Sequence, residues 1–524
     1  MGKTVTITIS RYNPETDEHP LFRKYEVPCG EQELVLGALF HIYEKMDSTL
    51  LFSHGCRYRN CGKCAIKING KPALACETLL ADGMVLEPLD NLPVMRDLAV
   101  DRSGLFESLK RHDTLISPKS GDERVVQHPE FLQLIRCNEC LACLSSCPVY
   151  AQDVGYDGPF IGIKLAALKY DAREARDELN HLATFLEKCL HCKQCQVNCP
   201  WELRFPEAAT RIKGELFGRA PLPVRDWLLS RPRLIGALAS FLPVPANAAI
   251  ANQGVRRVLD RLIGIDQKMP LPQYAKGVLR GMKASKPSGL KAAYFLGCFD
   301  KYNAPEIVRS SLSLLSESGI DVEVIDPGCC GEPFIATGDL ASARKRADAV
   351  AAVLKSRIDE GYDIVFSCPS CGSMIRDEYP FLFQLLTDTD LQAHIFDLGE
   401  YLLLNHGSGR IGLKFKGARK KIAYKAPCHL KAQHIGTPFV DLLKLVPDLE
   451  VSVFDRCCGM AGTIGFKKEK IELSMKVGEP LADEIRKEAP ELVLSDCAAC
   501  RMRIAAGTKA LTCHPIVFLE QERK

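Results

Sequence analysis

Long apolar runs and an excess of charge of one sign are both missing from this sequence. No stretch approaches the roughly 20 uninterrupted apolar residues of a membrane-spanning helix, so none is expected. Residues 1–20 contain no apolar run of the kind that a secretory signal needs, which predicts a cytoplasmic protein. Lysine and arginine number 68 against 65 aspartate and glutamate, so no overall field favours nucleic acid as a partner.

Cysteine, by contrast, is abundant, with 24 residues in the chain. A reducing cytoplasm argues against a disulfide framework, so metal binding is the better interpretation. All cysteines except Cys29 and Cys513 fall into clusters with regular spacing. We expect these two to be buried residues without a ligand role.

The first cluster lies in residues 56–76, CRYRNCGKCAIKINGKPALAC. Its spacing is the plant-type 2Fe-2S pattern, in which a tight loop supplies three thiolates and a nearby strand or turn the fourth. Gly55 and Gly62 suit a loop whose backbone amides approach the cluster sulfurs. A zinc site is the alternative, but the spacing is unusual for zinc. The expected 2Fe-2S ligands are Cys56, Cys61, Cys64 and Cys76.

Two further clusters repeat the bacterial ferredoxin run C-x2-C-x2-C-x3-C-P, at residues 137–148 and 189–200. In paired runs of this kind the fourth cysteine of each run ligates the other cluster. Zinc is again the alternative, and four thiolates at this repeat suit iron-sulfur chemistry better. One cubane 4Fe-4S cluster is therefore expected on Cys137, Cys140, Cys143 and Cys199, and another on Cys189, Cys192, Cys195 and Cys147.

The C-terminal half contains a direct duplication, PGCCGEPF at 327–334 and FDRCCGMAG at 454–462. In each copy, short apolar runs end in cysteine and alternate with helix-like stretches, which predicts α/β modules with cysteines beyond the strand C-termini. Each module would bring five thiols together. The sequence leaves open whether they bind an ordinary cluster with one spare thiol, a zinc ion, or an unusual cluster with bridging thiolates. The two sets are Cys298, Cys329, Cys330, Cys368 and Cys371, and Cys428, Cys457, Cys458, Cys497 and Cys500.

Residues 218–275 between these halves are apolar but interrupted by prolines and flanked by arginines. A helical connector that packs against the next domain is the favoured interpretation. The alternative is a shallow, interfacial membrane contact at headgroup level. The side chains expected to make that contact are Trp227, Arg225, Arg231 and Arg233.

The chain is therefore expected to be a multidomain protein. Alternating apolar residues predict strands at 3–10 and 25–29, and helical spacing predicts a helix at 31–46. The expected domains are a β-grasp plant-type 2Fe-2S ferredoxin domain at 1–115, an α-helical domain for two 4Fe-4S clusters at 116–217, a helical connector at 218–288, and duplicated α/β modules at 289–417 and 418–524.

Four further side chains adjoin these cysteines. His429 and His514 are expected to be hydrogen-bonded structural residues, with proton transfer to a leaving thiolate as the alternative. Lys425 and Lys431 flank Cys428, and solvated surface lysines are favoured over recognition of an anionic thiol substrate bearing sulfonate or phosphate.

The duplicated frame resembles the CCG domains in the catalytic subunit of heterodisulfide reductase. In that family, the five cysteines of each copy bind a noncubane 4Fe-4S cluster, and a disulfide is cleaved between the two clusters. The resemblance implies that both five-cysteine sets are metal ligands and also catalytic. The substrate would then lie at a pseudo-twofold interface between the modules.

Residues 1–210 resemble the iron-sulfur subunit of succinate dehydrogenase and fumarate reductase, on the motif CRxxxCGxCAxxINGxxxLAC. Those subunits often carry a 3Fe-4S cluster in the last run, with one cysteine missing. Here the last run has all four cysteines. This departure from the family pattern argues against direct electron transfer to a membrane quinone.

The fusion of the two halves is similar to the B subunits of the thiol:fumarate reductase family, which couple fumarate reduction to oxidation of coenzyme M and coenzyme B thiols. The resemblance implies a flavoprotein partner with FAD and the fumarate site, because this chain has no recognisable dinucleotide fingerprint or dicarboxylate-binding arginine set. It also implies one 2Fe-2S, two cubane 4Fe-4S and two noncubane 4Fe-4S clusters, and small thiols or disulfides as substrates. The alternative is pure electron transfer, as in the CCG-containing subunits of glycerol-3-phosphate, glycolate and lactate dehydrogenases that feed quinones.

Overall fold

The computed structural model describes residues 3–119, 125–152, 155–176, 179–217, 222–276, 283–284 and 289–524. The chain forms two compact units, the first of Met1–Cys189 with Lys193–Ile212 and the second of Leu190–Cys192 with Lys213–Lys524. Residues 218–221 and 285–288, at two of the predicted domain boundaries, lie outside the described residues.

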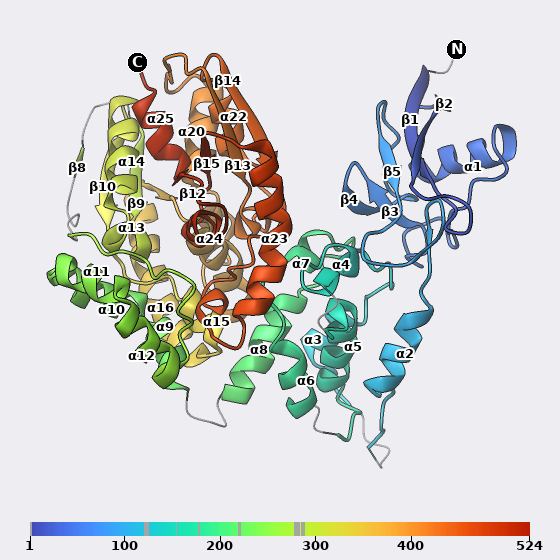
Figure 1. Ribbon diagram of the computed structural model, residues 1–524, viewed down its shortest axis with the longest axis horizontal. Coiled ribbons are helices and arrows are strands. Elements are labelled where there is room, and N and C mark those ends of the chain that lie inside the picture. Colours follow the sequence, from blue (N-terminus) through green and yellow to red (C-terminus); the bar gives the residue numbers. More distant parts are fainter. Residues whose placement is uncertain are drawn as a thin grey trace. The chain divides into compact units, whose positions relative to one another are not determined.

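A five-stranded sheet in the order β2-β1-β5-β3-β4 begins the first unit (Figure 1). The hairpin of β1 (Lys3–Arg11) and β2 (Leu21–Cys29) runs in register from the Lys3 and Cys29 pair to the Arg11 and Leu21 pair. The remaining strands are β3 (Ala65–Ile68), β4 (Lys71–Leu74) and β5 (Val85–Glu87), and helix α1 (Val35–Lys45) buries Leu39 and Ile42. The two strands and the helix predicted from the sequence are confirmed.

Helices build the rest of the first unit, after the small strands β6 (Val94–Arg96) and β7 (Ala99–Val100). Helix α5 is buried along most of its length because α3, α4 and α6 all pack against it. The helices are α2 (Ser103–Arg111), α3 (Pro129–Leu134), α4 (Ala142–Ser145), α5 (Gly158–Tyr170), α6 (Leu179–Leu186), α7 (Gln194–Val197) and α8 (Phe205–Phe217), with a short 3-10 turn at Tyr150–Gln152.

The connector consists of four short helices, α9 (Val224–Leu229), α10 (Pro232–Phe241), α11 (Pro243–Ala251) and α12 (Gln253–Ile263). Asn252 caps α12 by accepting hydrogen bonds from the amides of Gly254 and Val255, which satisfies donors that the first turn leaves free. In the described part of the chain, no single helix has the length and apolarity of a membrane span. Together α10 and α11 have both, but a bend of 114° separates them.

The first α/β module has a sheet in the order β12-β11-β9-β10-β8. Its parallel strands are β9 (Lys291–Phe295), β10 (Asp321–Ile325), β11 (Asp363–Phe366) and β12 (Ile395–Asp397), with β8 (Lys283–Ala284) antiparallel at the edge. Its helices are α13 (Cys298–Tyr302), α14 (Pro305–Glu317), α15 (Glu332–Thr337), α16 (Leu340–Asp359), α17 (Pro369–Ser373), the π-helix η2 (Met374–Glu378), α18 (Tyr379–Phe383), α19 (Thr389–Gln392) and α20 (Leu398–Gly407).

The second module repeats this strand order as β16-β15-β13-β14, all parallel. Its strands are β13 (Lys420–Lys425), β14 (Leu449–Phe454), β15 (Leu492–Leu494) and β16 (Thr512–Cys513). Its helices are α21 (Cys428–Lys431), α22 (Pro438–Leu443), η3 (Ile464–Phe466), α23 (Ile471–Glu488), α24 (Ala498–Thr508) and α25 (Pro515–Gln521).

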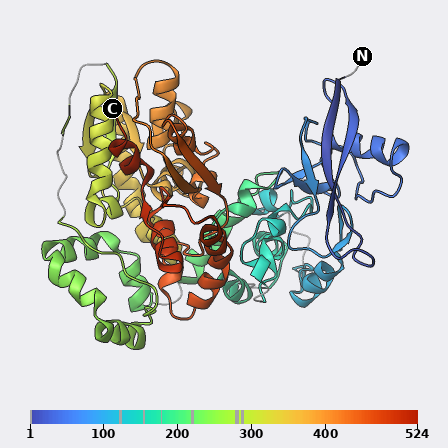
Figure 2. The same ribbon diagram turned by 45° about the horizontal axis from the view of Figure 1, so that its top comes forward.

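The two modules share one hydrophobic core. Helix α14 packs against α25, and α20 against α22, and side chains of both modules, Tyr294 and Tyr424 among them, lie in a single buried cluster. Helices flank the strands of each module in both views (Figures 1 and 2). A shared core fixes the relative placement of the two modules, which matters for the sites that they carry.

Candidate functional site

The loop at residues 55–64 surrounds sulfur with backbone amides. The amide of Cys56 donates to Cys61 Sγ at 3.2 Å, and the amide of Cys61 donates back to Cys56 Sγ at 3.2 Å. Positive φ angles at Arg57 and Arg59 turn the chain, and the amide of Arg59 donates to the Sγ of the fourth cysteine, Cys76, at 3.2 Å. The loop therefore offers four sulfurs and the amides that stabilise negative charge on them.

The thiols of this loop differ in acidity. The Tyr58 amide and the amide of Cys61 lower the pKa of Cys56 to about 7. Burial and contact with Cys76 raise the pKa of Cys64 to about 12. A bound metal would hold all four as thiolates, because it supplies the positive charge that buried sulfur needs.

One cavity of the first unit is lined by the first ferredoxin run together with the end of the second. Burial raises the pKa of Cys140 to about 12 and that of Cys143 well above its usual range, so thiolates here need a nearby positive charge. The structure brings together Cys137, Cys140, Cys143 and Cys199, with Asn138, Leu141, Phe160, Ile163, Trp201 and Leu203 around them.

The two ferredoxin runs have the same backbone. Glu139 and Leu141 adopt left-handed conformations in the first run, as His191 and Lys193 do at the matching positions of the second. Helices α4 and α7, which follow these turns, pack together. Cys147 lies two residues after α4, Cys189 lies three residues after α6, and Cys195 lies in α7. Together with Cys192, these three cysteines therefore occupy positions equivalent to the first set, and their assignment to a second cubane stays a prediction.

The 2Fe-2S loop and the first ferredoxin run touch each other. Asn138 Nδ2 donates to the Arg59 carbonyl at 3.0 Å, and Arg102 Nη1 donates to the Glu139 carbonyl at 2.9 Å. Arg102 also reaches the carbonyl of Gly62 at 3.5 Å, so its guanidinium joins the two loops. Burial lowers the pKa of Arg102, although the thiols around it act in the opposite sense. Sequence reasoning missed Arg102, since it lies 26 residues beyond Cys76 (102 − 76) in a stretch without a motif.

Trp201 is a second residue that sequence reasoning missed. Its ring lies beneath the guanidinium groups of Arg59, at 4.7 Å, and Arg136, at 5.2 Å. The indole thus forms part of the wall of the cavity beside the first ferredoxin run and also contacts Arg59 in the 55–64 loop. Its position directly after Pro200 was the available signal.

In the first α/β module the five predicted thiols form a continuous chain of contacts. Cys298 contacts Cys329, which contacts Cys330; Cys330 contacts Cys371, which contacts Cys368. The Tyr379 hydroxyl donates to the carbonyl of Cys330 at 2.7 Å and fixes the double-cysteine turn. All five cysteines follow strand ends or the turns after them, as predicted.

The second module also brings its five predicted thiols together, three of them in contact. Cys458 Sγ lies 3.3 Å from Cys500 Sγ, and Cys500 also contacts Cys497. Cys428 and Cys457 interact electrostatically with Cys500, and burial raises the pKa of Cys428 to about 11. Lys425 extends into this group of thiols.

The two five-thiol sites adjoin each other. Helix α17 of the first module packs against α21 of the second, where His429 Nδ1 lies 3.0 Å from Ser370 Oγ and Gln433 Nε2 donates to the Pro369 carbonyl at 3.2 Å. Contact with Cys500 and burial raise the pKa of Cys497, and the charge of Cys368 in the first module adds to this shift. Cys368 and Cys497 are thus thiols of different modules that interact electrostatically.

Known proteins share each of these parts. Three family descriptions match: a 2Fe-2S iron-sulfur cluster binding domain at residues 6–107, a 4Fe-4S dicluster domain at 133–203, and the CCG cysteine-rich domain at 292–376 and 422–505. One subunit of the fumarate reductase (CoM/CoB) of Methanothermobacter marburgensis is 28% identical over 95% of this chain and 94% of its own length. One subunit of the anaerobic glycerol-3-phosphate dehydrogenase of Escherichia coli is 30% identical over 74% of this chain and 97% of its own. The chain belongs to this family of iron-sulfur oxidoreductase subunits.

The N-terminal part of the chain, taken by itself, also has relatives. The fumarate reductase iron-sulfur subunit of Mycobacterium tuberculosis is 37% identical over 38% of this chain and 87% of its own length. The expected resemblance to the thiol:fumarate reductase B subunits is confirmed. This oxidoreductase subunit is thus an iron-sulfur electron-transfer protein related to subunits of both fumarate reductases and the anaerobic glycerol-3-phosphate dehydrogenase.

Two expectations about side chains of this CCG protein were wrong. Lys425 is 2% exposed and is not a surface lysine, because strand β13 ends inside the module. Cys29 and Cys513 are partly exposed, not buried. His514 is a buried structural residue, as expected, with Nε2 3.2 Å from the Ser367 carbonyl, and burial lowers its pKa well below the usual range. Lys431 pairs with Asp455 at 2.6 Å.

The connector arginines do not lie at a free surface. Arg225 pairs with Glu469 at 2.7 Å, Arg231 with Asp339 at 3.4 Å, and Arg233 with Asp326 at 2.6 Å. These ion pairs join the connector to both modules, as the packing interpretation predicted. The ion pairs do not support the alternative, in which these three side chains face lipid headgroups.

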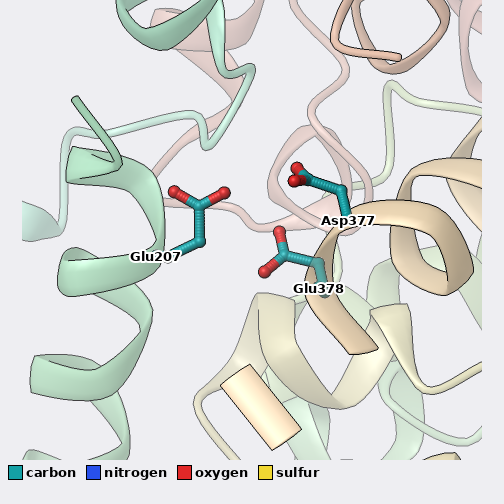
Figure 3. Close-up of side chains that lie close together, drawn as sticks. All are labelled: Glu207, Asp377 and Glu378. Carbon is teal, nitrogen blue, oxygen red and sulfur yellow. The ribbon is translucent and has the colours of Figure 1, made fainter. Parts of the chain in front are cut away.

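Three carboxylates drawn in Figure 3 belong to different units: Glu207 to α8 in the first, and Asp377 and Glu378 to η2 in the second. Within the first unit, Glu207 is fully buried and lies 3.3 Å from Lys193 Nζ, whose side chain is also buried. This ion pair accounts for the buried carboxylate without a metal ion.

Proposed function

We propose that this chain is the iron-sulfur subunit of a fumarate reductase or succinate dehydrogenase type complex that couples thiol oxidation to fumarate reduction. Two thiols would be joined as a disulfide at the paired five-cysteine sites, releasing two electrons and two protons. Fumarate would take up two electrons and two protons at a flavoprotein partner that carries FAD. The relative that spans most of this chain is named as part of a CoM/CoB fumarate reductase, so coenzyme M and coenzyme B are the proposed thiols.

The observation that carries the proposal is the pair of complete thiol sites side by side. A relay centre needs one module with four ligands, whereas here ten thiols form two sites that adjoin where α17 packs against α21. Disulfide chemistry involves two sulfur atoms, and two adjoining sites offer each of them its own position. The completeness of both copies thus favours a catalytic pair over a single relay.

The donor sets fit iron-sulfur clusters. All donors are sulfur, and buried thiols with raised pKa need a compensating cation, which a cluster supplies. When bound, such clusters accept and release electrons one at a time. We assign one 2Fe-2S cluster, two cubane 4Fe-4S clusters and two noncubane 4Fe-4S clusters to the five predicted cysteine sets.

Other side chains and backbone groups of this protein would stabilise charge on sulfur, hold the loops together and transfer protons. Amides of the 55–64 loop hold negative charge on sulfur, and Arg102 keeps that loop against the first ferredoxin run. Ser370 and Gln433 hold His429 at the interface of the modules, where its ring could move a proton to or from a thiol. Five of the ten cysteines are buried, namely Cys329, Cys330, Cys371, Cys458 and Cys500, and the other five are partly exposed.

Anaerobic purification with the flavoprotein partner tests the proposal. About 18 irons per chain are expected from the five clusters. The mixed disulfide of coenzymes M and B should oxidise a reduced viologen dye. Cys330→Ser or Cys458→Ser should abolish this reaction and leave dye-driven fumarate reduction by the partner largely intact. Quinone-dependent succinate oxidation without any disulfide-dependent dye oxidation would overturn the proposal.

A second function, electron transfer to a membrane quinone, is favoured by the outer face of the connector. In α12 the polar Arg256 and Asp260 are buried, whereas Val258 is 52% exposed and Leu262 78% exposed, the reverse of a soluble amphipathic helix. In α10, Leu238 is 71% and Phe241 84% exposed. Such a face suits the boundary of a bilayer.

Flotation with vesicles of phosphatidylglycerol and of phosphatidylcholine tests this contact. The wild-type complex should float with the former and Leu262→Asp should not, with the equally exposed Leu511→Asp as control (78% and 73%). Equal recovery of all three proteins would exclude the contact.

A further inference from the structure

Lys425 breaks the symmetry between the two thiol sites. It ends strand β13 three residues before Cys428, and Phe295 ends β9 three residues before Cys298. The residue before each is a buried tyrosine, Tyr424 or Tyr294, so the two strands match position by position. Lys425 is 2% exposed and Phe295 is 1% exposed. One module thus buries a cation where the other buries an aromatic ring.

The Lys425 ammonium is surrounded by sulfur. Its Nζ donates to the Ala426 carbonyl at 2.7 Å, and its charge interacts with the thiol of Cys500. Its charge interacts with Cys428, Cys457 and Cys458 as well. In the described residues of the second module no carboxylate forms an ion pair with it. A buried cation without a carboxylate partner costs several kcal/mol unless negative charge on sulfur compensates it.

The cations beside the first site are arranged differently. Arg233 interacts with Cys298 and Cys329, but it shares Asp326 with Lys301, each at 2.6 Å. The side chains of Arg233 and Lys301 keep 25% and 17% of their surface exposed, so water reaches both. A carboxylate and solvent therefore weaken the positive field at the first site. Lys425 is shielded from solvent and has no carboxylate within ion-pair distance among the described residues, although its charge also acts on the buried Asp496.

We propose that the ammonium of Lys425 makes the two CCG sites electrostatically unequal, so that electrons and anionic thiolates are held preferentially at the second site. The inference rests on the proposed function only in requiring that both sites hold iron-sulfur clusters. A fixed cation stabilises whichever state carries more negative charge, because the interaction grows with that charge. The second cluster is therefore the easier of the two to reduce, and an incoming thiolate meets its counter-ion there.

Redox titration of the full chain with its partner, monitored by electron paramagnetic resonance, tests the inference without any substrate. In the wild-type protein the two centres should differ in reduction potential. Cys330→Ser removes the first site and should leave the centre of higher potential; Cys458→Ser removes the second and should leave the centre of lower potential. These two cysteine variants test the inference even if variants of Lys425 fail to fold.

Lys425→Met then removes the charge at similar volume. The equilibrium constant for electron transfer between the two centres should change about tenfold in favour of the first. This change corresponds to 59 mV for a one-electron couple. Lys425→Arg should keep the wild-type order. Phe295→Met is the matched control at the equivalent strand end and should leave both potentials unchanged, with iron and sulfide contents confirming that both sites are filled.

Equal potentials in the wild type, or a Lys425→Met protein with full iron content and unchanged potentials, would overturn the inference. A different outcome would separate the inference from the proposed function. If the two potentials differ and depend on Lys425, but the complex neither makes nor cleaves disulfides, the proposed function is wrong and the inference still holds.

Discussion

Gly62 lies so close to Asn138 that no other residue fits there without movement. A Cβ atom at position 62 would meet the Asn138 carbonyl oxygen at 2.4 Å and the amide nitrogen of Cys140 at 2.7 Å. Both obstacles are backbone atoms, which cannot rotate away. The 2Fe-2S loop and the first ferredoxin run therefore touch at a point that depends on the missing side chain.

Gly62→Ala should separate these two loops. Overpacking of this kind typically costs about 1–3 kcal/mol, and the φ of +65° adds strain for alanine. We expect a lower apparent melting temperature and slower electron transfer between the 2Fe-2S centre and the rest of the chain, measured by stopped-flow reduction. Gly70→Ala is the control, because its φ is +78° and nothing lies within 4 Å of its Cβ. Equal effects of both substitutions would show that backbone strain alone is responsible.

Arg102→Leu should also weaken the contact between the 55–64 loop and the first ferredoxin run, through the loss of hydrogen bonds. It removes the donors to the carbonyls of Glu139 and Gly62, and hydrogen bonds from charged groups contribute about 1.5–3 kcal/mol each. It also removes a cation that interacts with Cys61, Cys64 and Cys140. We expect lower reduction potentials for both the 2Fe-2S centre and the first cubane. Arg111→Leu, whose side chain is 63% exposed, should change neither potential.

The duplicated double-cysteine turns should respond unequally to the same substitution. A Cβ at Gly459 would meet the Ser474 carbonyl oxygen at 2.1 Å, whereas one at Gly331 would first meet Cε of Met374 at 3.2 Å. A methionine side chain can yield and a helix backbone cannot, although both glycines have positive φ. Gly459→Ala should therefore lose iron from the second module, and Gly331→Ala should retain more, as measured by iron per chain. Equal losses would contradict this difference in packing.

Glu174 should contribute to acid sensitivity of the first unit. Hydrogen bonds from Arg176, with those from the amides of Arg176 and Ser117, lower the pKa of Glu174 from 4.5 to about 2. A carboxyl whose pKa is depressed on folding stabilises the protein above its unfolded pKa and loses this effect as pH falls towards 2. The melting temperature of Glu174→Gln should therefore fall below that of wild type at pH 7, and the gap should narrow below pH 4.5. Glu26→Gln, on the exposed edge of β2, should show no such gap at either pH.

The cysteine sets and the order of the modules could be predicted because ligand spacing and strand ends are local properties. Three left-handed residues in the 55–64 loop, and two in each ferredoxin run, lie within a few residues of the sulfurs that they orient. The alternation of apolar runs with cysteines likewise indicated where strands would end. By contrast, Arg102 and Trp201 show no local sign of their roles, since their partners lie far away in the chain.

The sequence by itself determined how many thiols each site has and that the C-terminal module occurs twice, because spacing and repetition are written along the chain. The tertiary structure alone decided which distant groups meet. Burial of Lys425, the ion pairs of the connector arginines and the approach of Gly62 to Asn138 all follow from the packing of separate elements. Such contacts depend on the whole fold, and no local pattern encodes whether a lysine at a strand end meets water or sulfur.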